Sequence, residues 1–344
     1  MGDHRKFIID RVQSETSQAK TFFIKPVEGE PPAYKPGQFL HLAFPARNNT
    51  EYRSYSFSSI PEEGMAFTVK GMENGNISRL FHDHYKEGDV LSLVNIAGKF
   101  VLPDDLSGIQ QVFLFAAGSG ITPVFSIMKF LLLHHPHINI FLAYSNGSPQ
   151  QTIFYHTLQE LQQQFPDRLE IEFIFSNNKN LLKARLSGFW LQELVAWHKK
   201  ADWAHILAYT CGPLEYMDTV KITLFTEGVV PQQFFMEYFE TMSEDMIVAP
   251  EDKEAHTVHI LLPEKEVSLR VQYPDSILDA GLNAGLHLPH SCRSGQCGSC
   301  TARIVKGEVW MQYNEVLTHT DLQQGLTLTC MGFPVNGDVT ITYD

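Results

Sequence analysis

Residues 290–300 read HSCRSGQCGSC and place Cys292, Cys297 and Cys300 in a Cys-x4-Cys-x2-Cys pattern. A fourth cysteine, Cys330, follows in the β-rich stretch LTLTCMG. The glycines and serines of residues 290–300 allow tight bends that point backbone N–H groups at a bound anionic group. We therefore expect four thiolates to converge, three from one loop and one from a distant strand.

The spacing of these cysteines is typical of a plant-type [2Fe–2S] cluster. The alternatives are a structural zinc site and cysteines that only fill a core. Structural zinc usually takes two short Cys or His pairs, and Cys330 has no near partner in the sequence. We therefore expect all four cysteines to be ligands of a [2Fe–2S] cluster.

The segment around the cysteines predicts a small α+β domain of the β-grasp type, over residues 255–344. Two alternating strands, at residues 256–262 and 267–273, precede a helix near residues 276–285 and further short strands. The acidic stretch before this domain, residues 241–254, predicts an exposed linker.

Residues 106–240 alternate apolar strands with helical patterns, beginning with QVFLFAA and then TPVFSIMKFLLLHH. Such alternation predicts a doubly wound α/β domain with a parallel sheet. Strands this uniformly apolar indicate that helices cover both faces. The other strands expected here read INIFLAYS, LEIEFIFS and AHILAYT, and the other helices lie near TIFYHTLQELQQQF, near GFWLQELVAWH and after Pro213.

Residues 1–105 carry many short β-rich runs separated by Gly, Pro and Asn clusters. This pattern predicts an antiparallel β-barrel with one short helix at SRLFHDHY. The runs read KFIIDRV, TFFIKPV, QFLHLAF, RSYSFS, AFTVKG and VLSLV. The chain is therefore expected to contain three domains, with the linker before the third.

Composition narrows the class of protein. The formal net charge is −13, which argues against nucleic-acid binding because that function needs a basic face. No apolar run is long enough to predict a membrane span, and the N-terminus lacks the apolar core of a secretory signal. The five cysteines are an odd number, unlike a secreted disulfide framework. We expect a cytoplasmic protein without nucleic-acid or membrane partners.

The stretch RSYSFSS in the predicted barrel places Arg53, Tyr55 and Phe57 on one face of a strand. An Arg beside an aromatic ring suits a planar cofactor that carries phosphate, but an aromatic face turned into the barrel core explains the pattern equally well. Downstream, Gly75 and Ser78 precede a short helix whose N-terminus could bind an anion. Ser78 could also serve simply as the helix N-cap.

Gly118 and Gly120 follow the first apolar strand of the second domain, in FAAGSGITP. Two glycines at this spacing allow a pyrophosphate to approach the backbone closely. Thr122 is expected to cap the following helix and Pro123 to be its first residue. The full Gly-x-Gly-x-x-Gly fingerprint is absent, so a plain strand–turn–helix connection is the alternative.

Cys211, Gly212 and Pro213 follow the fourth apolar strand of the same domain. Ligands gather at the carboxyl ends of parallel strands, so this turn is a second candidate binding loop. Cys211 is not part of the cluster pattern, and a buried small apolar residue is the other explanation for it.

Together these motifs resemble the ferredoxin–NADP reductase superfamily, in the subgroup that carries a plant-type ferredoxin domain at the C-terminal end. The resemblance covers nearly the whole chain in the order flavin barrel, nicotinamide-nucleotide domain, ferredoxin domain. It is strongest to reductase subunits of the phenylacetyl-CoA epoxidase type and to related oxygenase reductases.

The resemblance implies a flavin site on the barrel. In the family's Arg-x-Tyr-Ser motif, Arg53 would hold the flavin diphosphate, Tyr55 would pack on the isoalloxazine and Ser56 would lie near N5. The family's Gly-x-x-Ser pyrophosphate turn is matched by Gly75, Ile77 and Ser78. The pairing of the two motifs favours FAD over FMN.

The resemblance also implies a nicotinamide site on the second domain. Thr122 would lie close to both rings, and the Glu-x-Phe pattern of Glu237 and Phe239 would close the site, with the Phe239 ring on the other side of the flavin. The matching loop residues are Gly118, Gly120, Thr122 and Pro123, together with Cys211, Gly212 and Pro213.

One departure from the family concerns the choice of electron donor. Members that prefer NADP often carry Arg after Tyr-x-Asn, whereas here Gly147 follows Tyr144-Ser145-Asn146. Ser176 and Arg185 are expected where a 2′-phosphate could be held. The donor is therefore NADPH or NADH, with NADPH favoured.

The function that the resemblance implies is electron transfer from NAD(P)H through the flavin and the [2Fe–2S] cluster to an acceptor protein. A multicomponent oxygenase, such as a phenylacetyl-CoA epoxidase, is the leading acceptor. Alternatives are another acceptor (a steroid hydroxylase, a desaturase or a hybrid-cluster protein) and a non-catalytic redox sensor or electron carrier. The acidic ferredoxin domain suggests a basic docking patch on the partner.

Overall fold

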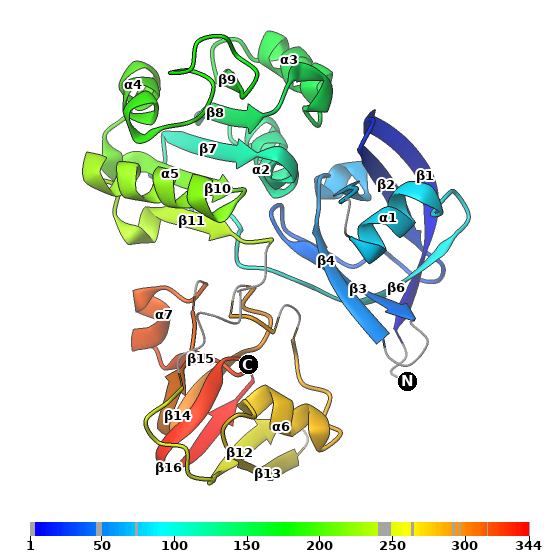
Figure 1. The fold of residues 1–344 in the computed structure, drawn as a ribbon, viewed down its shortest axis with the longest axis vertical. Coiled ribbons are helices and arrows are strands. Elements are labelled where there is room, and N and C mark those ends of the chain that lie inside the picture. Colours follow the sequence, from blue (N-terminus) through cyan, green and yellow to red (C-terminus); the bar gives the residue numbers. More distant parts are fainter. Residues whose placement is uncertain are drawn as a thin grey trace. The chain divides into compact units, whose positions relative to one another are not determined.

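The computed structural model of the protein describes residues 4–45, 50–72, 75–239, 249–262, 265–290, 293–295, 297–314 and 316–343. The chain divides into two compact units, unit 1 (residues 1–239) and unit 2 (residues 240–344) (Figure 1). Over the described residues, no helix has the length and apolar character that crossing a membrane requires.

The first part of unit 1 is an antiparallel barrel. Its strands are β1 (Arg5–Thr16), β2 (Ala19–Pro26), β3 (Phe39–Pro45), β4 (Thr50–Ser56), β5 (Met65–Lys70) and β6 (Val90–Ala97), in the order β4-β3-β6-β1-β2-β5. A bridge between Phe57 and Phe67 brings the end of β4 to β5 and so closes the sheet. Alternate residues such as Phe22 and Leu40 point inward, where α1 (Asn76–Asp83) adds Phe81 to the core.

The second part of unit 1 is a five-stranded parallel sheet. Its strands are β7 (Gln111–Ala117), β8 (Asn139–Asn146), β9 (Leu169–Phe175), β10 (Ile206–Cys211) and β11 (Phe234–Glu237), in the order β11-β10-β7-β8-β9. The helices are α2 (Ile121–His134), α3 (Tyr155–Gln164), α4 (Gly188–His198) and α5 (Leu214–Glu227).

The period of two in β7 shows how this sheet is covered. Val112 and Leu114 belong to the apolar core that contains α2 and α3, whereas Phe113 and Phe115 belong to the core that contains α4 and α5. Helices therefore lie on both faces (Figure 1), as the uniformly apolar strands predict, and the strand carboxyl ends remain for the loops.

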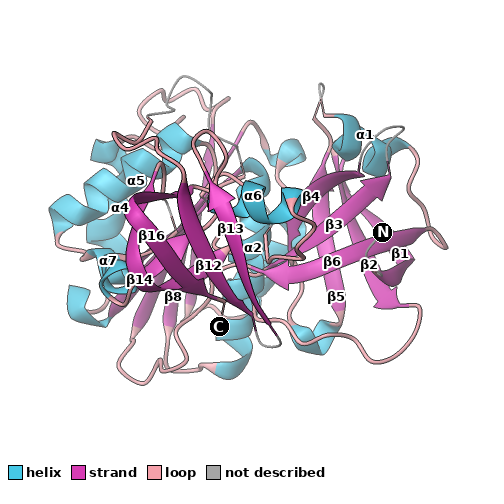
Figure 2. Ribbon diagram, turned by 90° about the horizontal axis from the view of Figure 1, so that it is seen from below, coloured by secondary structure: helices cyan, strands magenta, loops and turns pink. Residues whose placement is uncertain are grey.

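Unit 2 is a mixed sheet with one packed helix, an α+β fold (Figure 2). Its elements are β12 (His256–Leu262), β13 (Lys265–Val271), α6 (Ile277–Asn283), β14 (Thr301–Met311), α7 (His319–Gln323), β15 (Leu326–Leu328) and β16 (Gly332–Thr342). The strand order is β13-β12-β16-β14-β15, with β12 and β16 parallel and the other neighbours antiparallel. Ile277 and Leu278 of α6 complete its core.

Two predicted helix starts are wrong. Gly75 is the N-cap of α1, so Ser78 lies inside the first turn. Residues Gly118–Gly120 form a 3₁₀ turn, η2, and α2 starts at Ile121, which makes Thr122 and Pro123 its second and third residues. Gly120 already has helical backbone angles, so the chain needs no Thr cap at this point. The other 3₁₀ turns are η1 (Pro61–Glu63), η3 (Pro149–Gln151), η4 (Trp203–His205) and η5 (Pro231–Gln233).

The strands after the cysteine loop also differ from expectation. The sequence predicts short strands here, whereas β14 and β16 have 11 residues each and pair along most of their length. Strand β11 was not predicted, because its four residues carry too little periodicity to recognise.

Candidate functional site

A buried hydrogen bond joins the barrel to the edge of the parallel sheet. The Ser56 hydroxyl, at the end of β4, donates to Oε2 of Glu237 at 2.8 Å. Glu237 ends β11 and pairs with Cys211, the last residue of β10. All three side chains are buried. The structure thus brings together three residues that the sequence placed in three separate motifs.

Burial controls the protonation of the Glu237 carboxyl and the Cys211 thiol. Removal from water raises the pKa of Glu237 from an ordinary 4.5 to about 8, against the opposing effect of the Ser56 hydrogen bond. Burial, and secondarily the nearby Glu237, raise the pKa of the Cys211 thiol well above its ordinary value. Both groups are therefore neutral at pH 7, and the Glu237 carboxyl can hold a proton beside Ser56.

The two candidate nucleotide loops lie against each other. A Cβ placed on Gly120 would be 2.1 Å from the carbonyl oxygen of Cys211, and one on Gly212 would be 2.9 Å from the Cβ of Ala117. Only glycine lets the loops after β7 and β10 approach this closely. Pro213 then leads into α5 as its N-cap residue.

The first of these loops has its own internal support. Gly118 has a φ of +56°, and its carbonyl accepts a hydrogen bond from the Tyr144 hydroxyl at 2.9 Å. The Thr122 hydroxyl donates to the Ser119 carbonyl at 3.1 Å, and Thr122 is buried. The loop is thus preformed at the N-terminus of α2, where backbone N–H groups suit a phosphate.

Lys70 is a residue that sequence reasoning missed. Its Nζ lies 3.9 Å from the position of a Cβ on Gly118, although Lys70 ends β5 in the barrel. The available signal was the alternation of β5: Met65, Phe67 and Val69 fill the barrel core, so Lys70 must point outward. An ammonium group beside a glycine loop fits an anionic nucleotide.

The strand with the Arg-x-Tyr-Ser motif presents an exposed cation and a partly buried ring. Arg53 donates to Glu51 at 3.0 Å and remains about half exposed. The Tyr55 ring contacts Phe67 and Phe81, with centroids 5.5 and 5.2 Å apart. Tyr55 thus rests on the barrel core but keeps an exposed part, which fits the packing of a planar ligand.

The turn before α1 is closed by its own serine. The Ser78 hydroxyl accepts from the Met72 backbone N–H at 3.2 Å and donates to the Gly75 carbonyl at 3.3 Å. A Cβ on Gly75 would lie 2.2 Å from the Ser78 Oγ, so a larger residue would displace the Ser78 side chain. Ile77 belongs to the barrel core. The first N–H groups of α1 are left for an anion.

Three other predicted residues lie after β9, before α4 and after β11. Ser176 follows β9, where its backbone N–H donates to the Asn146 carbonyl at 2.9 Å. Arg185 is exposed in the segment before α4, and within the described part of the chain no hydrogen bond joins it to Ser176. Phe239 is 48% exposed, two residues after Glu237.

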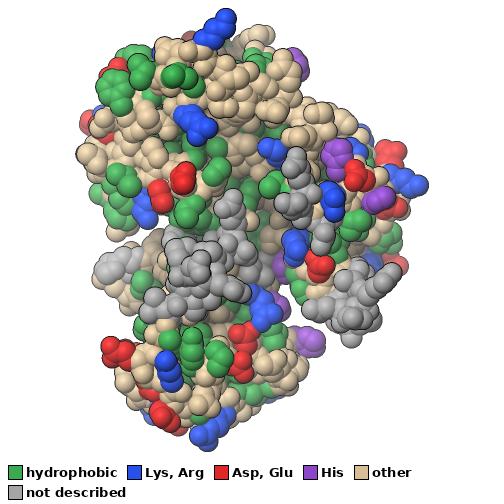
Figure 3. Space-filling view, viewed as in Figure 1, with side chains coloured by type: hydrophobic (Ala, Val, Ile, Leu, Met, Phe, Trp, Pro, Cys, Tyr) green, Lys and Arg blue, Asp and Glu red, His purple; other side chains and the backbone are tan. Residues whose placement is uncertain are grey.

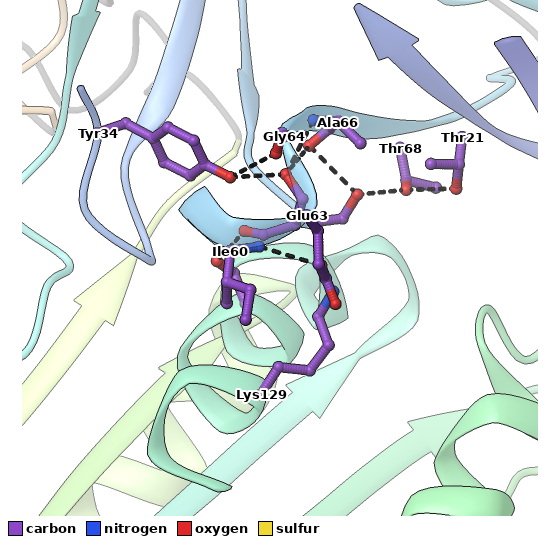
Figure 4. Close-up of polar contacts among 11 residues, drawn as sticks. Thr21, Tyr34, Ile60, Glu63, Gly64, Ala66, Thr68 and Lys129 are labelled. Atoms are coloured by element: carbon purple, nitrogen blue, oxygen red, sulfur yellow. Dashed lines mark hydrogen bonds and ion pairs between the residues drawn. The ribbon is translucent and has the colours of Figure 1, made fainter. Parts of the chain in front are cut away.

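Helix α2 fastens the barrel to the parallel sheet. The Ser126 hydroxyl donates to the Ser59 carbonyl at 2.6 Å, and Lys129 forms an ion pair with Glu63 (Figure 4). Ser59 also contacts the Tyr34 hydroxyl at 2.8 Å. These contacts hold the segment that follows Ser56, and so they help to set its position against the parallel sheet.

The cysteine loop of unit 2 is only partly described, and Cys292 lies outside the described residues. Cys300 and Cys330 are buried and Cys297 is partly buried. The Ser299 N–H points at the Cys297 sulfur at 3.5 Å, as expected for a loop that donates to thiolates. Gly295 has a φ of +74°, and a Cβ there would lie 2.8 Å from the Tyr313 carbonyl oxygen.

The donor set fits an iron–sulfur cluster in its chemistry, with soft thiolates and N–H groups. Within the described residues, no group of three or more His, Cys, Asp or Glu could hold a metal ion. Those residues include Cys297, Cys300 and Cys330 but not Cys292. The four-cysteine ligand set therefore stays a prediction.

Two domain families match the chain. Residues 261–335 match the 2Fe-2S iron-sulfur cluster binding domain, and residues 114–221 match the oxidoreductase NAD-binding domain. The first range contains all four cysteines of the pattern, and the second contains both candidate nucleotide loops.

Curated relatives and solved structures extend over the whole chain. The ferredoxin reductase component of 3-ketosteroid-9-alpha-monooxygenase from Mycolicibacterium smegmatis is 32% identical, over 98% of this chain and 96% of the relative. A component of 1,2-phenylacetyl-CoA epoxidase from Escherichia coli is 30% identical, over 98% and 96%. Phthalate dioxygenase reductase has the same fold, with a TM-score of 0.61 and 22% identity over 99% of this chain and 98% of that one.

Proposed function

The chain belongs to the ferredoxin–NADP reductase-type reductase components that carry a C-terminal [2Fe–2S] domain, and on this premise we propose that it transfers electrons from NAD(P)H through FAD and the cluster to an oxygenase component. The observation that carries the proposal is the Ser56–Glu237 hydrogen bond. It joins the end of β4 to the end of β11, beside Cys211, and this supports a site in which a flavin and a nicotinamide ring could stack.

When bound, the cofactors supply hydride transfer and single-electron transfer, and the protein supplies binding and orientation. On the barrel side, Tyr55 would pack against the flavin ring. Arg53 and the N-terminus of α1, which begins after Gly75, would hold the diphosphate. Ser56 would lie beside the ring, and the neutral Glu237 that accepts its hydrogen bond would hold a proton at a buried position.

On the side of the parallel sheet, the Gly118–Gly120 loop (the glycine loop) and the Cys211–Gly212 turn would bind the nicotinamide nucleotide. The close approach of Gly120 to Cys211 fixes the positions of the two loops relative to each other. Thr122 is the second residue of α2, directly after the glycine loop. Lys70 extends from the barrel to the same loop, so it would contact a nucleotide phosphate only when the two domains are assembled.

We further propose NADPH as the preferred donor, held at its 2′-phosphate by Ser176 and Arg185. Both residues follow the edge strand β9, and Arg185 is exposed in the segment that precedes α4. An exposed guanidinium is well suited to bind phosphate.

The acceptor is proposed to be the terminal component of a multicomponent oxygenase in the cytoplasm. Relatives that are similar over their full length serve a steroid monooxygenase and a phenylacetyl-CoA epoxidase, and the latter is the leading candidate. On the face of unit 2 seen in Figure 3, acidic and basic side chains are interspersed. The net charge of −13 nevertheless favours a partner with a basic docking patch.

The test is an anaerobic titration of the purified protein with NADPH and then NADH, followed by visible absorption. We expect flavin and iron–sulfur bands that both bleach, at lower concentrations with NADPH. Chromatography of the released flavin checks FAD against FMN. A flavin that no nicotinamide reduces would support the alternative of a non-catalytic redox carrier, and failure to reduce oxygenase components would point to another class of acceptor.

A further inference from the structure

Thr329 lies between two predicted cluster ligands that are distant in the sequence. It precedes Cys330, and both its backbone N–H and its hydroxyl donate to the carbonyl oxygen of Cys300, at 3.2 and 3.0 Å. Its side chain is fully buried. Thr329 thus links the backbone of Cys300, at the end of the cysteine loop, to that of its neighbour Cys330, which follows β15.

Tyr343 adds a further link to this contact. Directly after β16, its hydroxyl donates to the Oγ1 of Thr329 at 2.9 Å. Tyr343 is partly buried and packs against the core of unit 2.

The remaining polar group of Thr329 is also occupied. Its carbonyl accepts the backbone N–H of Leu278, in the first turn of α6, at 3.0 Å. Thr329, itself fully buried, therefore connects the cysteine loop, the residue after β16 and helix α6. A buried chain of this kind is cooperative, because each donated bond polarises the next hydroxyl.

We propose that Thr329 and Tyr343 are positioning residues for the cluster, holding Cys300 and Cys330 at a fixed separation and thereby setting cluster retention and potential. The proposal rests on the [2Fe–2S] assignment made above. The donors of Thr329 point their positive ends at the carbonyl oxygen of Cys300, so they act on the cluster through the backbone of its ligand and not through a hydrogen bond to sulfur. Hydrogen bonding and solvent access around cluster ligands help to determine the reduction potential. Removing a hydrogen bond of Thr329 or Tyr343 should therefore lower the reduction potential of the cluster.

The experiment uses full-length Tyr343→Phe, Thr329→Val and Thr329→Ser variants. We measure the midpoint potential of the cluster by a spectroscopic redox titration, and the rate of cluster loss to a chelator from the decay of visible absorbance. Tyr273→Phe is the matched control, since among the described residues its hydroxyl has no hydrogen-bond partner and its ring lies in the same unit.

We expect Tyr343→Phe to lower the potential and to speed cluster loss about fivefold, which corresponds to ~1 kcal/mol, the net contribution of one neutral hydrogen bond. Thr329→Val should have a larger effect, because it also leaves the Tyr343 hydroxyl buried without its acceptor. Thr329→Ser keeps the hydroxyl and should remain near the wild type, as should the control.

Wild-type potential and release rate in Tyr343→Phe would overturn the proposal, as would equal effects of Thr329→Ser and Thr329→Val. If Thr329→Val does not fold, the Tyr343→Phe and Thr329→Ser proteins still decide between these outcomes. A wild-type protein without iron and labile sulfide would instead refute the proposed function itself, so the two failures are distinguishable.

Discussion

The buried Glu237 carboxyl predicts an unusual pH dependence of stability. Its pKa is raised by burial from 4.5 to about 8 in the folded protein. The unfolded chain releases this proton near pH 4.5, whereas the folded chain keeps it up to about pH 8. The folded state then binds more protons, so the free energy of unfolding falls as pH rises through this window and levels off above it.

The size of the effect follows from the shift. Each pKa unit corresponds to about 1.4 kcal/mol, so the full window costs up to ~5 kcal/mol. Between about pH 5.5 and about pH 7.5 the loss should be ~2–3 kcal/mol. Glu237→Gln keeps a neutral group of similar shape that can still accept a hydrogen bond from Ser56. The free energy of unfolding of this variant should therefore lack the fall with pH that Glu237 causes.

The assay is urea unfolding of both proteins across that pH range, followed by tryptophan fluorescence. Trp190, Trp197 and Trp203 all lie in the α/β domain that contains Glu237, so they report on its unfolding. Glu160→Gln is the control, because Glu160 is exposed on α3. The reasoning is refuted if Glu237→Gln keeps the wild-type slope, or if the wild type becomes more stable relative to this variant as pH rises.

Three other perturbations test separate parts of the site. Lys70→Met should raise the KM for the nicotinamide nucleotide about 10-fold with unchanged flavin content, because a hydrogen bond to a charged group contributes ~1.5–3 kcal/mol; an unchanged KM in steady-state assays would remove Lys70 from the site. Gly120→Ala should cost ~2 kcal/mol or more in urea unfolding, since its Cβ would lie 2.1 Å from a carbonyl oxygen, while Gly108→Ala, in open space, should be neutral. Cys300→Ser should abolish the iron–sulfur absorbance but leave flavin reduction by NAD(P)H intact, and a retained cluster signal would contradict the ligand assignment.

Local patterns predicted much of this protein. The alternation of QVFLFAA with helical segments predicted a parallel sheet covered on both faces, and β7 has the predicted bounds. The cysteine spacing predicted the iron–sulfur domain, which the match over residues 261–335 supports. Both signals are readable because the period of a strand and the spacing within one loop are properties of neighbouring residues.

Helix starts were less predictable, for a physical reason. Thr122 has the chemistry of an N-cap, but the preceding glycines adopt a 3₁₀ turn and begin the helix earlier. Residue preference for a cap is a weak local effect, and the close contact of Gly120 with Cys211, made between distant strands, outweighs it.

The sequence alone determined which chemical groups are present and the order of the domains that carry them, because those depend on composition and short-range spacing. Only the tertiary structure decided which groups meet. Ser56 reaches Glu237 across 181 residues, Lys70 reaches the glycine loop from another domain, and Tyr343 reaches Cys300 through Thr329. Such contacts depend on how whole sheets and helices pack, and no local pattern in the chain encodes the distance between two residues that packing brings together.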